Sequence, residues 1–215
     1  MYIWPFPNNS FSENTYVLAD AESNECVILD PGMSNEQEWT VVRDCISSHG
    51  LKVTGIWLTH CHVDHELGTK YVSKEYNLPV CGPIEDYEKL PTARLQALFF
   101  GIPFANSVVP VTVNINEGDK LHIGQIEVQV FDIPGHSHHG LCYYLPSEET
   151  LFTGDVLFCR SIGRSDFGPS MGCDGEALVD GIRCKLLNLP PTTIVYPGHG
   201  PTTTIADEVE QNPYF

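Results

Sequence analysis

The segment Thr59-His60-Cys61-His62-Val63-Asp64-His65 constrains the fold most strongly, because it places four metal-competent side chains within six residues. It follows directly after the apolar run Gly55–Leu58, which predicts a buried strand that ends where the histidines begin. In a loop that leaves a strand, alternate side chains can turn toward one point, and the last histidine can join them as a helix begins. Imidazole nitrogens and carboxylates are the ligands that zinc and related divalent ions prefer. The segment therefore predicts a metal site at the end of a strand.

Further polar motifs follow other apolar runs along the chain. Six short β-rich runs are predicted to be buried strands: Tyr16–Ala19, Cys26–Leu29, Gly55–Leu58, Glu127–Ile133, Cys142–Leu145 and Thr193–Tyr196. Pro134-Gly135-His136 follows the fourth run, Pro197-Gly198-His199 follows the sixth, and Thr153-Gly154-Asp155 ends another apolar stretch. Strand ends gather at one edge of an α/β sheet, where such folds usually place their sites. We therefore expect these motifs to lie beside the histidine-rich segment.

Two segments with helical spacing lie between the predicted strands. The first begins at Ser34, which resembles a capping box with Gln37, and it ends near Gly50. The second is an apolar stripe from Leu178 to Leu189, which two prolines close. Strands mixed with helices predict the α/β class.

Composition narrows the class of protein further. The 215 residues suit one domain, residues 1–215, and the 42% of hydrophobic residues suffice for a continuous core. The 11 basic and 28 acidic residues give a net charge of −17, which argues against a nucleic-acid partner. Neither a signal peptide nor an apolar run of about 18 residues is visible, so we expect no membrane partner and a cytoplasmic location. The eight cysteines form no C-x-x-C pair and are expected to be reduced.

The motifs taken together resemble a known family. H-x-H-x-D-H is the hallmark of the metallo-β-lactamase superfamily, and the three later motifs occur in the order typical of that family. The resemblance extends from Asp30-Pro31-Gly32 to Pro201. It implies an αβ/βα four-layer sandwich, in which two mixed β-sheets pack face to face with helices outside. It also implies a small-molecule substrate and two divalent metal ions, expected to be zinc, with iron or manganese as alternatives.

The resemblance assigns a role to each motif residue. The implied first metal site is formed by His60, His62 and His136, the second by Asp64, His65 and His199, and Asp155 bridges both. Asp64 and Asp155 are the implied catalytic residues, because they would orient and hold a hydroxide that bridges the metals. Two divalent ions with two carboxylates leave a net charge of +2 that retains hydroxide, and metal binding lowers the pKa of water to about 7.

A later stretch of sequence indicates which branch of the family the chain resembles. Gly154–Phe158, followed by Ser161–Phe167, resembles the short bacterial members of the glyoxalase II-like group, which hydrolyse thioesters of the hydroxyacylglutathione type. A thioester suits this chemistry, because a thiol with a pKa near 8.5 leaves as thiolate with little help from an acid. Arg164 is predicted either to bind an anionic group of the substrate or to form an ion pair with Asp166.

Several alternatives remain open at this point. Persulfide dioxygenases share a similar Gly-Arg-x-Asp-Phe stretch, and His60, His136 and Asp155 could form their mono-iron triad. A lactonase or β-lactamase of the same fold, a flavo-diiron-type module and a non-enzymatic metal-stabilised scaffold are further alternatives. Only 16 residues follow His199, so we expect no counterpart of the C-terminal helical domain that supplies much of the glutathione contact in full-length glyoxalase II. The aromatic residues of the segment 82–110 either line the cleft instead or belong to the core.

Overall fold

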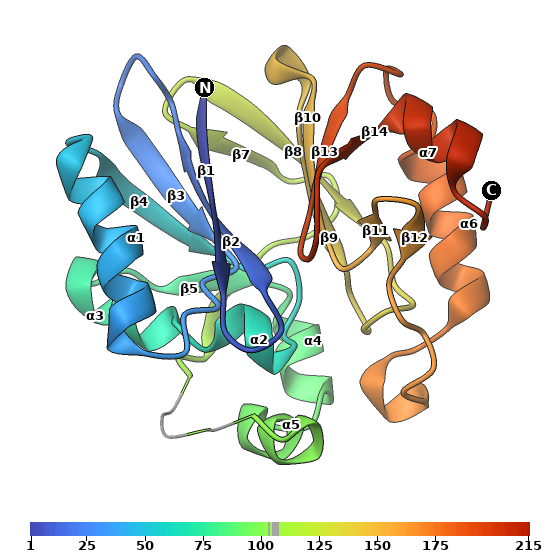
Figure 1. Cartoon of the computed structure of the whole chain (residues 1–215), viewed down its shortest axis with the longest axis horizontal. Helices are drawn as coiled ribbons and strands as arrows, with labels where there is room; N and C mark the ends of the chain where they lie inside the picture. The colour runs from blue at the N-terminus through green and yellow to red at the C-terminus, as the bar shows by residue number, and fades with distance from the viewer. Residues whose placement is uncertain (103, 105–107) are drawn as a thin grey trace.

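The structure is a computed structural model that describes residues 1–102, 104 and 108–215. Two six-stranded sheets lie face to face, with helices on their outer sides (Figure 1). The first sheet has the spatial order β1 (Tyr2–Asn8), β2 (Glu13–Ala19), β3 (Glu25–Leu29), β4 (Lys52–Trp57), β5 (Val80–Gly82) and β6 (Val111–Asn114). The second has the order β14 (Thr203–Thr204), β13 (Ile194–Pro197), β10 (Thr150–Gly154), β9 (Leu141–Leu145), β8 (Ile126–Asp132) and β7 (Lys120–Ile123). This arrangement confirms the predicted αβ/βα sandwich.

Both sheets are mixed, and strand direction decides where the functional loops lie. In the first sheet β3, β4, β5 and β6 run parallel, whereas β1, β2 and β3 pair antiparallel. In the second sheet β10 is parallel to β13 and antiparallel to β9, which in turn is antiparallel to β8. The strands β8, β10 and β13 therefore run in the same direction, and the loops that follow them leave at the same edge.

Apolar side chains fill three layers between the elements. Strand β2 shows the pattern, because Val17 packs toward the outer helices while its neighbour Leu18 packs between the two sheets. The layer between the sheets also contains Phe152 and Tyr143, which are fully buried. A third layer joins the second sheet to the helix that carries Leu178. Successive side chains of such a strand point to opposite faces of the sheet, and both faces are buried. Each sheet therefore packs against the other sheet on one face and against helices on the other, which gives the four layers of the fold.

The helices cover the sheets and one end of the sandwich. Their bounds are α1 Glu36–Ser48, α2 Val63–Glu66, α3 Thr69–Tyr76, α4 Ile84–Lys89, α5 Ala93–Phe100, α6 Gly175–Lys185 and α7 Ile205–Gln211. Helices α1 and α3 lie on the side of the first sheet, and α6 and α7 lie on the side of the second (Figure 1). A short hairpin, β11 (Leu157–Phe158) with β12 (Ser161–Ile162), follows β10, and two 3₁₀ turns span Pro146–Glu148 and Pro169–Met171. No helix in the described ranges is long and apolar enough to cross a bilayer.

The start of α1 differs from the predicted capping box. The cap is Asn35, whose extended backbone lets its side-chain oxygen accept hydrogen bonds from the N–H groups of Gln37 and Glu38, both at 3.0 Å. Ser34 lies one residue outside the helix, and its own N–H donates to Glu38 at 2.7 Å. The prediction of Ser34 as the capping residue was therefore wrong by one position.

The eight cysteines are free, as expected, and Cys26, Cys61 and Cys142 are buried.

Candidate metal centre

The seven predicted ligand residues lie together at one edge of the sandwich. His60 and His62 stand in the loop after β4, and Asp64 and His65 lie on the short helix α2 that follows it. The other three, His136, Asp155 and His199, lie in the loops after β8, β10 and β13. A backbone hydrogen bond from Leu141 N–H to the Thr59 carbonyl, at 2.8 Å, joins the two sheets next to this edge. Loops that are distant in sequence meet there because their strands end at the same side.

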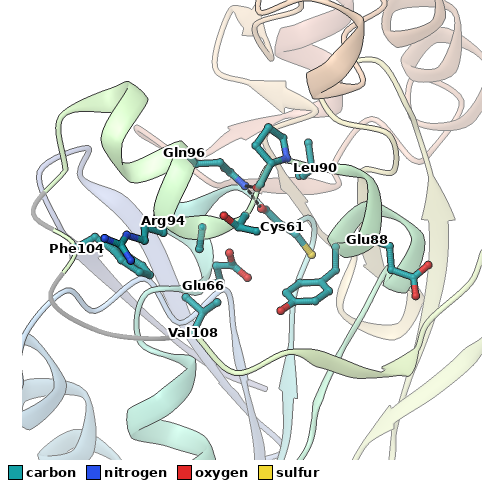
Figure 2. Close-up of a pocket in the computed structure, with 12 residues that line it drawn as sticks. Cys61, Glu66, Glu88, Leu90, Arg94, Gln96, Phe104 and Val108 are labelled. Carbon is teal, nitrogen blue, oxygen red and sulfur yellow. Dashed lines mark hydrogen bonds between the residues drawn. The ribbon is translucent and has the colours of Figure 1, made fainter.

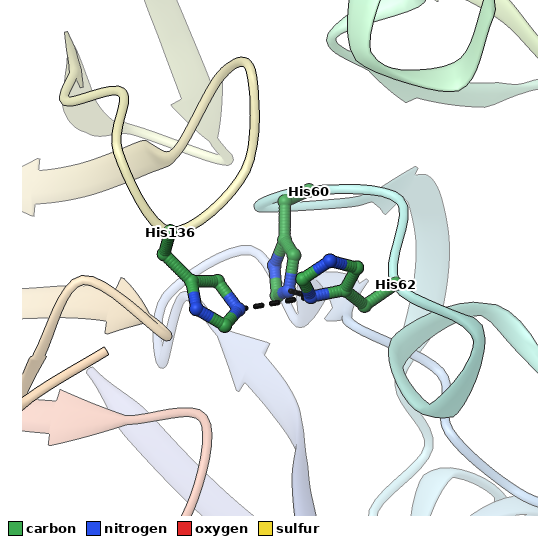
Figure 3. A group of neighbouring side chains, drawn as sticks. All are labelled: His60, His62 and His136. Carbon is green, nitrogen blue, oxygen red and sulfur yellow. Dashed lines mark hydrogen bonds between the residues drawn. The ribbon is translucent and has the colours of Figure 1, made fainter. Parts of the chain in front are cut away.

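Three imidazoles form the first cluster (Figure 3). Nδ1 of His62 lies 3.0 Å from Nε2 of His60 and 2.9 Å from Nε2 of His136, and all three side chains are buried. Burial lowers the pKa of His60 well below its usual value, that of His62 to about 3 and that of His136 below its usual value, which favours the neutral form of all three rings. Three neutral imidazoles that direct ring nitrogens at one point form a donor set suited to a divalent cation.

A carboxylate and two imidazoles form the second cluster. Oδ2 of Asp64 lies 3.3 Å from Nε2 of His199 and 3.8 Å from Nε2 of His65. Nε2 of His65 is buried and has no hydrogen-bond partner among the described residues. A buried polar atom without a partner is costly, so a cation bound at this cluster would satisfy it.

Asp155 lies between the two clusters. Its Oδ2 is 3.4 Å from Nε2 of His136 in the first cluster and 3.5 Å from Nε2 of His199 in the second. Burial alone would raise the pKa of this carboxyl, but His65 and His199 outweigh it and hold the pKa well below its usual value. Asp155 is therefore a carboxylate whose oxygens can reach ions in both clusters.

Hydrogen bonds on the outer side fix the orientation of the imidazoles. Nδ1 of His136 donates to the carbonyl of Arg164 at 2.8 Å, and Nδ1 of His199 donates to the carbonyl of Phe11 at 3.1 Å. A carbonyl can only accept, so the proton lies on Nδ1 and the Nε2 lone pair faces the cluster. Such outer partners fix the tautomer and ring orientation of metal-binding histidines.

Two buried carboxylates near His65 were not among the predicted site residues. Asp30 lies 3.1 Å from Nδ1 of His65 and also accepts from the N–H and hydroxyl of Thr59, both at 2.7 Å. Glu13 is fully buried, with Oε1 4.0 Å from Nδ1 of His65, and burial raises the pKa of this carboxyl well above its usual value. Asp30 stands in the Asp-Pro-Gly motif, which is a usable signal. Glu13 gives a weaker one, as a charged residue at the start of an apolar strand.

Arg164 is found near the cluster, but its charge is already paired. Its guanidinium donates twice to Asp166, at 2.9 Å for each contact, and it lies 4.3 Å above the ring of Phe167. Its side chain is 66% exposed, so the pair is screened by solvent. The geometry shows the ion pair, whereas the binding of a substrate anion stays a prediction. His139 contacts Asp132 at 2.6 Å, outside the two clusters.

Two cavities flank the loop that carries His60 and His62. The cavity over the metal-competent residues has a volume of about 290 Å³, and its lining includes Phe100 from α5. A second cavity, of about 430 Å³, is lined by Glu66, Cys61 and Tyr87 and by none of the seven predicted ligands (Figure 2). The first cavity is the candidate site, because the ring nitrogens and carboxylates face it. The sequence left open whether the aromatic side chains of the segment 82–110 line the cleft or belong to the core. Phe100 lines the candidate site, whereas Phe99 does neither and is 75% exposed.

Comparison with known proteins places this geometry in a family. The sequence model described as "Metallo-beta-lactamase superfamily" matches residues 9–199, and the chain belongs to that superfamily. It is 33% identical to "Hydroxyacylglutathione hydrolase GloC" of Haemophilus influenzae, over 100% of this chain and 98% of that protein.

Among solved structures, the chain resembles "BLEG-1 B3 metallo-beta-lactamase" with a TM-score of 0.86 and 33% identity, over 99% of both chains. It also resembles "TTHA1623 in a di-iron-bound form" with a TM-score of 0.84 and 34% identity, over 99% of this chain and 100% of the other. The chain is therefore a metallo-hydrolase-type member of the superfamily with a histidine-rich candidate metal site.

Proposed function

We propose that the enzyme hydrolyses small thioesters of the hydroxyacylglutathione type with a pair of divalent metal ions. The observation that carries the proposal is the position of Asp155, whose Oδ2 lies within 3.5 Å of a nitrogen in each cluster. His60, His62 and His136 would hold one ion, Asp64, His65 and His199 the other, and Asp155 both. A closed four-ligand cage is typical of structural zinc, whereas seven ligands beside an open cavity favour catalysis.

The donor set is compatible with more than one metal. When bound, two divalent ions supply a Lewis acid and lower the pKa of water to about 7. Imidazole and carboxylate ligands suit zinc, iron and manganese, and we propose zinc as the first choice. The relative crystallised in a di-iron-bound form makes iron the main alternative.

The residues of the chain itself define what reaction the cavity can support. Asp64 lies at the cavity surface with Oδ2 beside His199, a position from which it can accept a proton of an attacking water and orient it. Apart from the candidate ligands, the described lining is apolar except for Arg164, so the site offers no separate general acid. An amide nitrogen needs such an acid to leave, whereas a thiolate does not. A thioester therefore fits this lining better than an amide.

The likeness to the curated hydroxyacylglutathione hydrolase supports a thioester as the first choice. The direct test is turnover of S-lactoylglutathione by protein whose metal content has been measured. We expect hydrolysis with two metals per chain, and we expect Asp64→Asn to abolish it. Asp44→Asn serves as the matched control, because Asp44 is an exposed carboxylate on α1, outside the cavity lining.

Two other outcomes would replace the proposal. One iron per chain, with oxygen uptake on glutathione persulfide and no thioester hydrolysis, would identify a persulfide dioxygenase that uses His60, His136 and Asp155. Hydrolysis of lactones without hydrolysis of thioesters would identify a lactonase. The second cluster of Asp64, His65 and His199 argues against the dioxygenase, because a mono-iron triad leaves those residues without a role.

A further inference from the structure

Aromatic side chains form most of the wall of the cavity above the two clusters. Phe11, Phe100, Phe158 and Phe167 line it, together with Ile102. They come from the β1–β2 turn, from α5 and the residues after it, from β11 and from the segment after β12. Four segments distant in sequence thus each contribute a large apolar group to one small space. We call these five residues the aromatic wall.

The rings of the aromatic wall pack against one another and against the candidate ligands. Phe100 has its ring centre 6.1 Å from that of Phe11 and 5.4 Å from that of Phe167, in edge-to-face contacts. Phe167 reaches the ring of His62 at 6.5 Å, and Phe158 reaches the ring of His199 at 6.2 Å. The wall therefore extends from the cavity mouth, where Phe11 is 41% exposed, to both clusters.

The aromatic wall offers no partner to a charged acyl group. Asp64 and Asp155 would be engaged by the metal ions, and apart from the candidate ligands Arg164 is the one charged side chain of the described lining. Its guanidinium is engaged by Asp166 in two hydrogen bonds of 2.9 Å. A negatively charged acyl group would meet apolar surface without a free cation, which disfavours its desolvation.

The volume fits a ring next to the thioester. A dry apolar cavity of on the order of 150 Å³ accommodates benzene, so a cavity of about 290 Å³ has room for a phenyl group and the reacting carbonyl. Edge-to-face contacts with the phenylalanines would add to the burial of such a ring. A methyl group in the same place would leave most of the aromatic wall without contacts.

We infer that the acyl group of the preferred substrate is apolar and bears a ring, as in an aryl-substituted α-hydroxyacyl thioester. This inference rests on the proposed function and narrows its substrate class. Phe100 and Phe167 are then specificity-determining residues, because their rings meet each other at the centre of the wall. Apolar contacts of this kind discriminate substrates by about 10- to 200-fold per missing group in the best cases.

The test compares S-mandeloylglutathione with S-lactoylglutathione, which share the thiol carrier and the α-hydroxyl and differ only in phenyl for methyl. We expect kcat/KM to be at least about 10-fold higher for the mandeloyl ester. Phe100→Ala should reduce this ratio to near unity, with the larger fall in kcat/KM on the mandeloyl ester. Leu98→Ala is the matched control, since Leu98 is 79% exposed on the same helix and does not line this cavity.

A binding measurement separates substrate preference from chemistry. Calorimetric titration of the metal-loaded protein with mandelate and with lactate should show that mandelate binds about 10-fold more tightly. If Phe100→Ala does not fold, Phe167→Leu is the second variant, and it should reduce this difference in affinity. Hydrolysis of both thioesters with equal efficiency, or with lactoyl preferred, would overturn the inference and leave the proposed function standing. Hydrolysis of neither thioester by the two-metal protein would overturn both.

Discussion

Gly198, which lies between Pro197 and the predicted ligand His199, gives the sharpest test of the site geometry. A Cβ at Gly198 would lie 2.3 Å from Oδ1 of Asp155 and 2.8 Å from Cε1 of His65, where ordinary contacts begin at 3.4 Å. Gly198→Ala therefore forces the Asp155 carboxylate to move by about 1 Å, away from its position between the clusters. Misplacement by about 1 Å reduces catalysis by on the order of 100-fold, which corresponds to about 2.7 kcal/mol of transition-state stabilisation.

The assay is kcat/KM for thioester hydrolysis, with metal occupancy measured on the same samples. Gly200→Ala, two residues along the loop, is the matched control. Gly200 has a φ of +78° with no atom within 4 Å of its Cβ position, so alanine there costs about 1 kcal/mol of stability without reaching a ligand. Wild-type occupancy and activity in Gly198→Ala would refute the view that Asp155 must hold its present position.

Three further predictions concern the surroundings of the site and the core. Burial raises the pKa of Asp86 to about 6, above its value in the unfolded chain, so the wild type should lose up to about 3 kcal/mol relative to Asp86→Asn as the pH rises from about 4 to 7. Urea unfolding of both metal-free proteins across that range checks this, and a difference that does not vary with pH would contradict it. Asp30→Asn removes the carboxylate that orients His65 and should weaken metal binding by about 10- to 100-fold in a competition with a chromophoric chelator; unchanged affinity would argue against this role. Phe152→Ala opens a cavity between the two sheets and should cost about 3–5 kcal/mol in unfolding free energy, whereas the exposed Phe99→Ala should cost almost nothing. Equal losses in the two variants would show that the inter-sheet layer is not packed as described.

Much of the site could be anticipated because its signals are local. The segment from His60 to His65 carries four candidate ligands in sequence, and His136, Asp155 and His199 each follow a strand directly. Once those strands share a direction in the sheets, their loops meet at one edge without further information. The approach of the seven residues therefore follows from strand patterns and motif order, whereas the four-layer sandwich was implied by the resemblance to the family.

Features that depend on long-range packing could not be anticipated in the same way. Glu13 faces His65 only because the β1–β2 hairpin places it there, and its neighbours in sequence give no hint of that contact. Phe100 at the end of α5 contacts Phe11 and Phe167 from two different loops, so the spacing of these residues does not distinguish the wall of a cavity from core. At α1, Ser34 and Asn35 are both good capping residues, and the extended backbone at Asn35 decides between them.

An anomalous difference map from crystals of the protein with its native metals would test the account's central claim most directly. We predict two peaks, each about 2.0–2.2 Å from its ligands: one beside the ring nitrogens of His60, His62 and His136, and one beside Asp64, His65 and His199, with Asp155 in contact with both. A single peak at the first cluster, with Asp64 and His199 free of metal, would contradict the account.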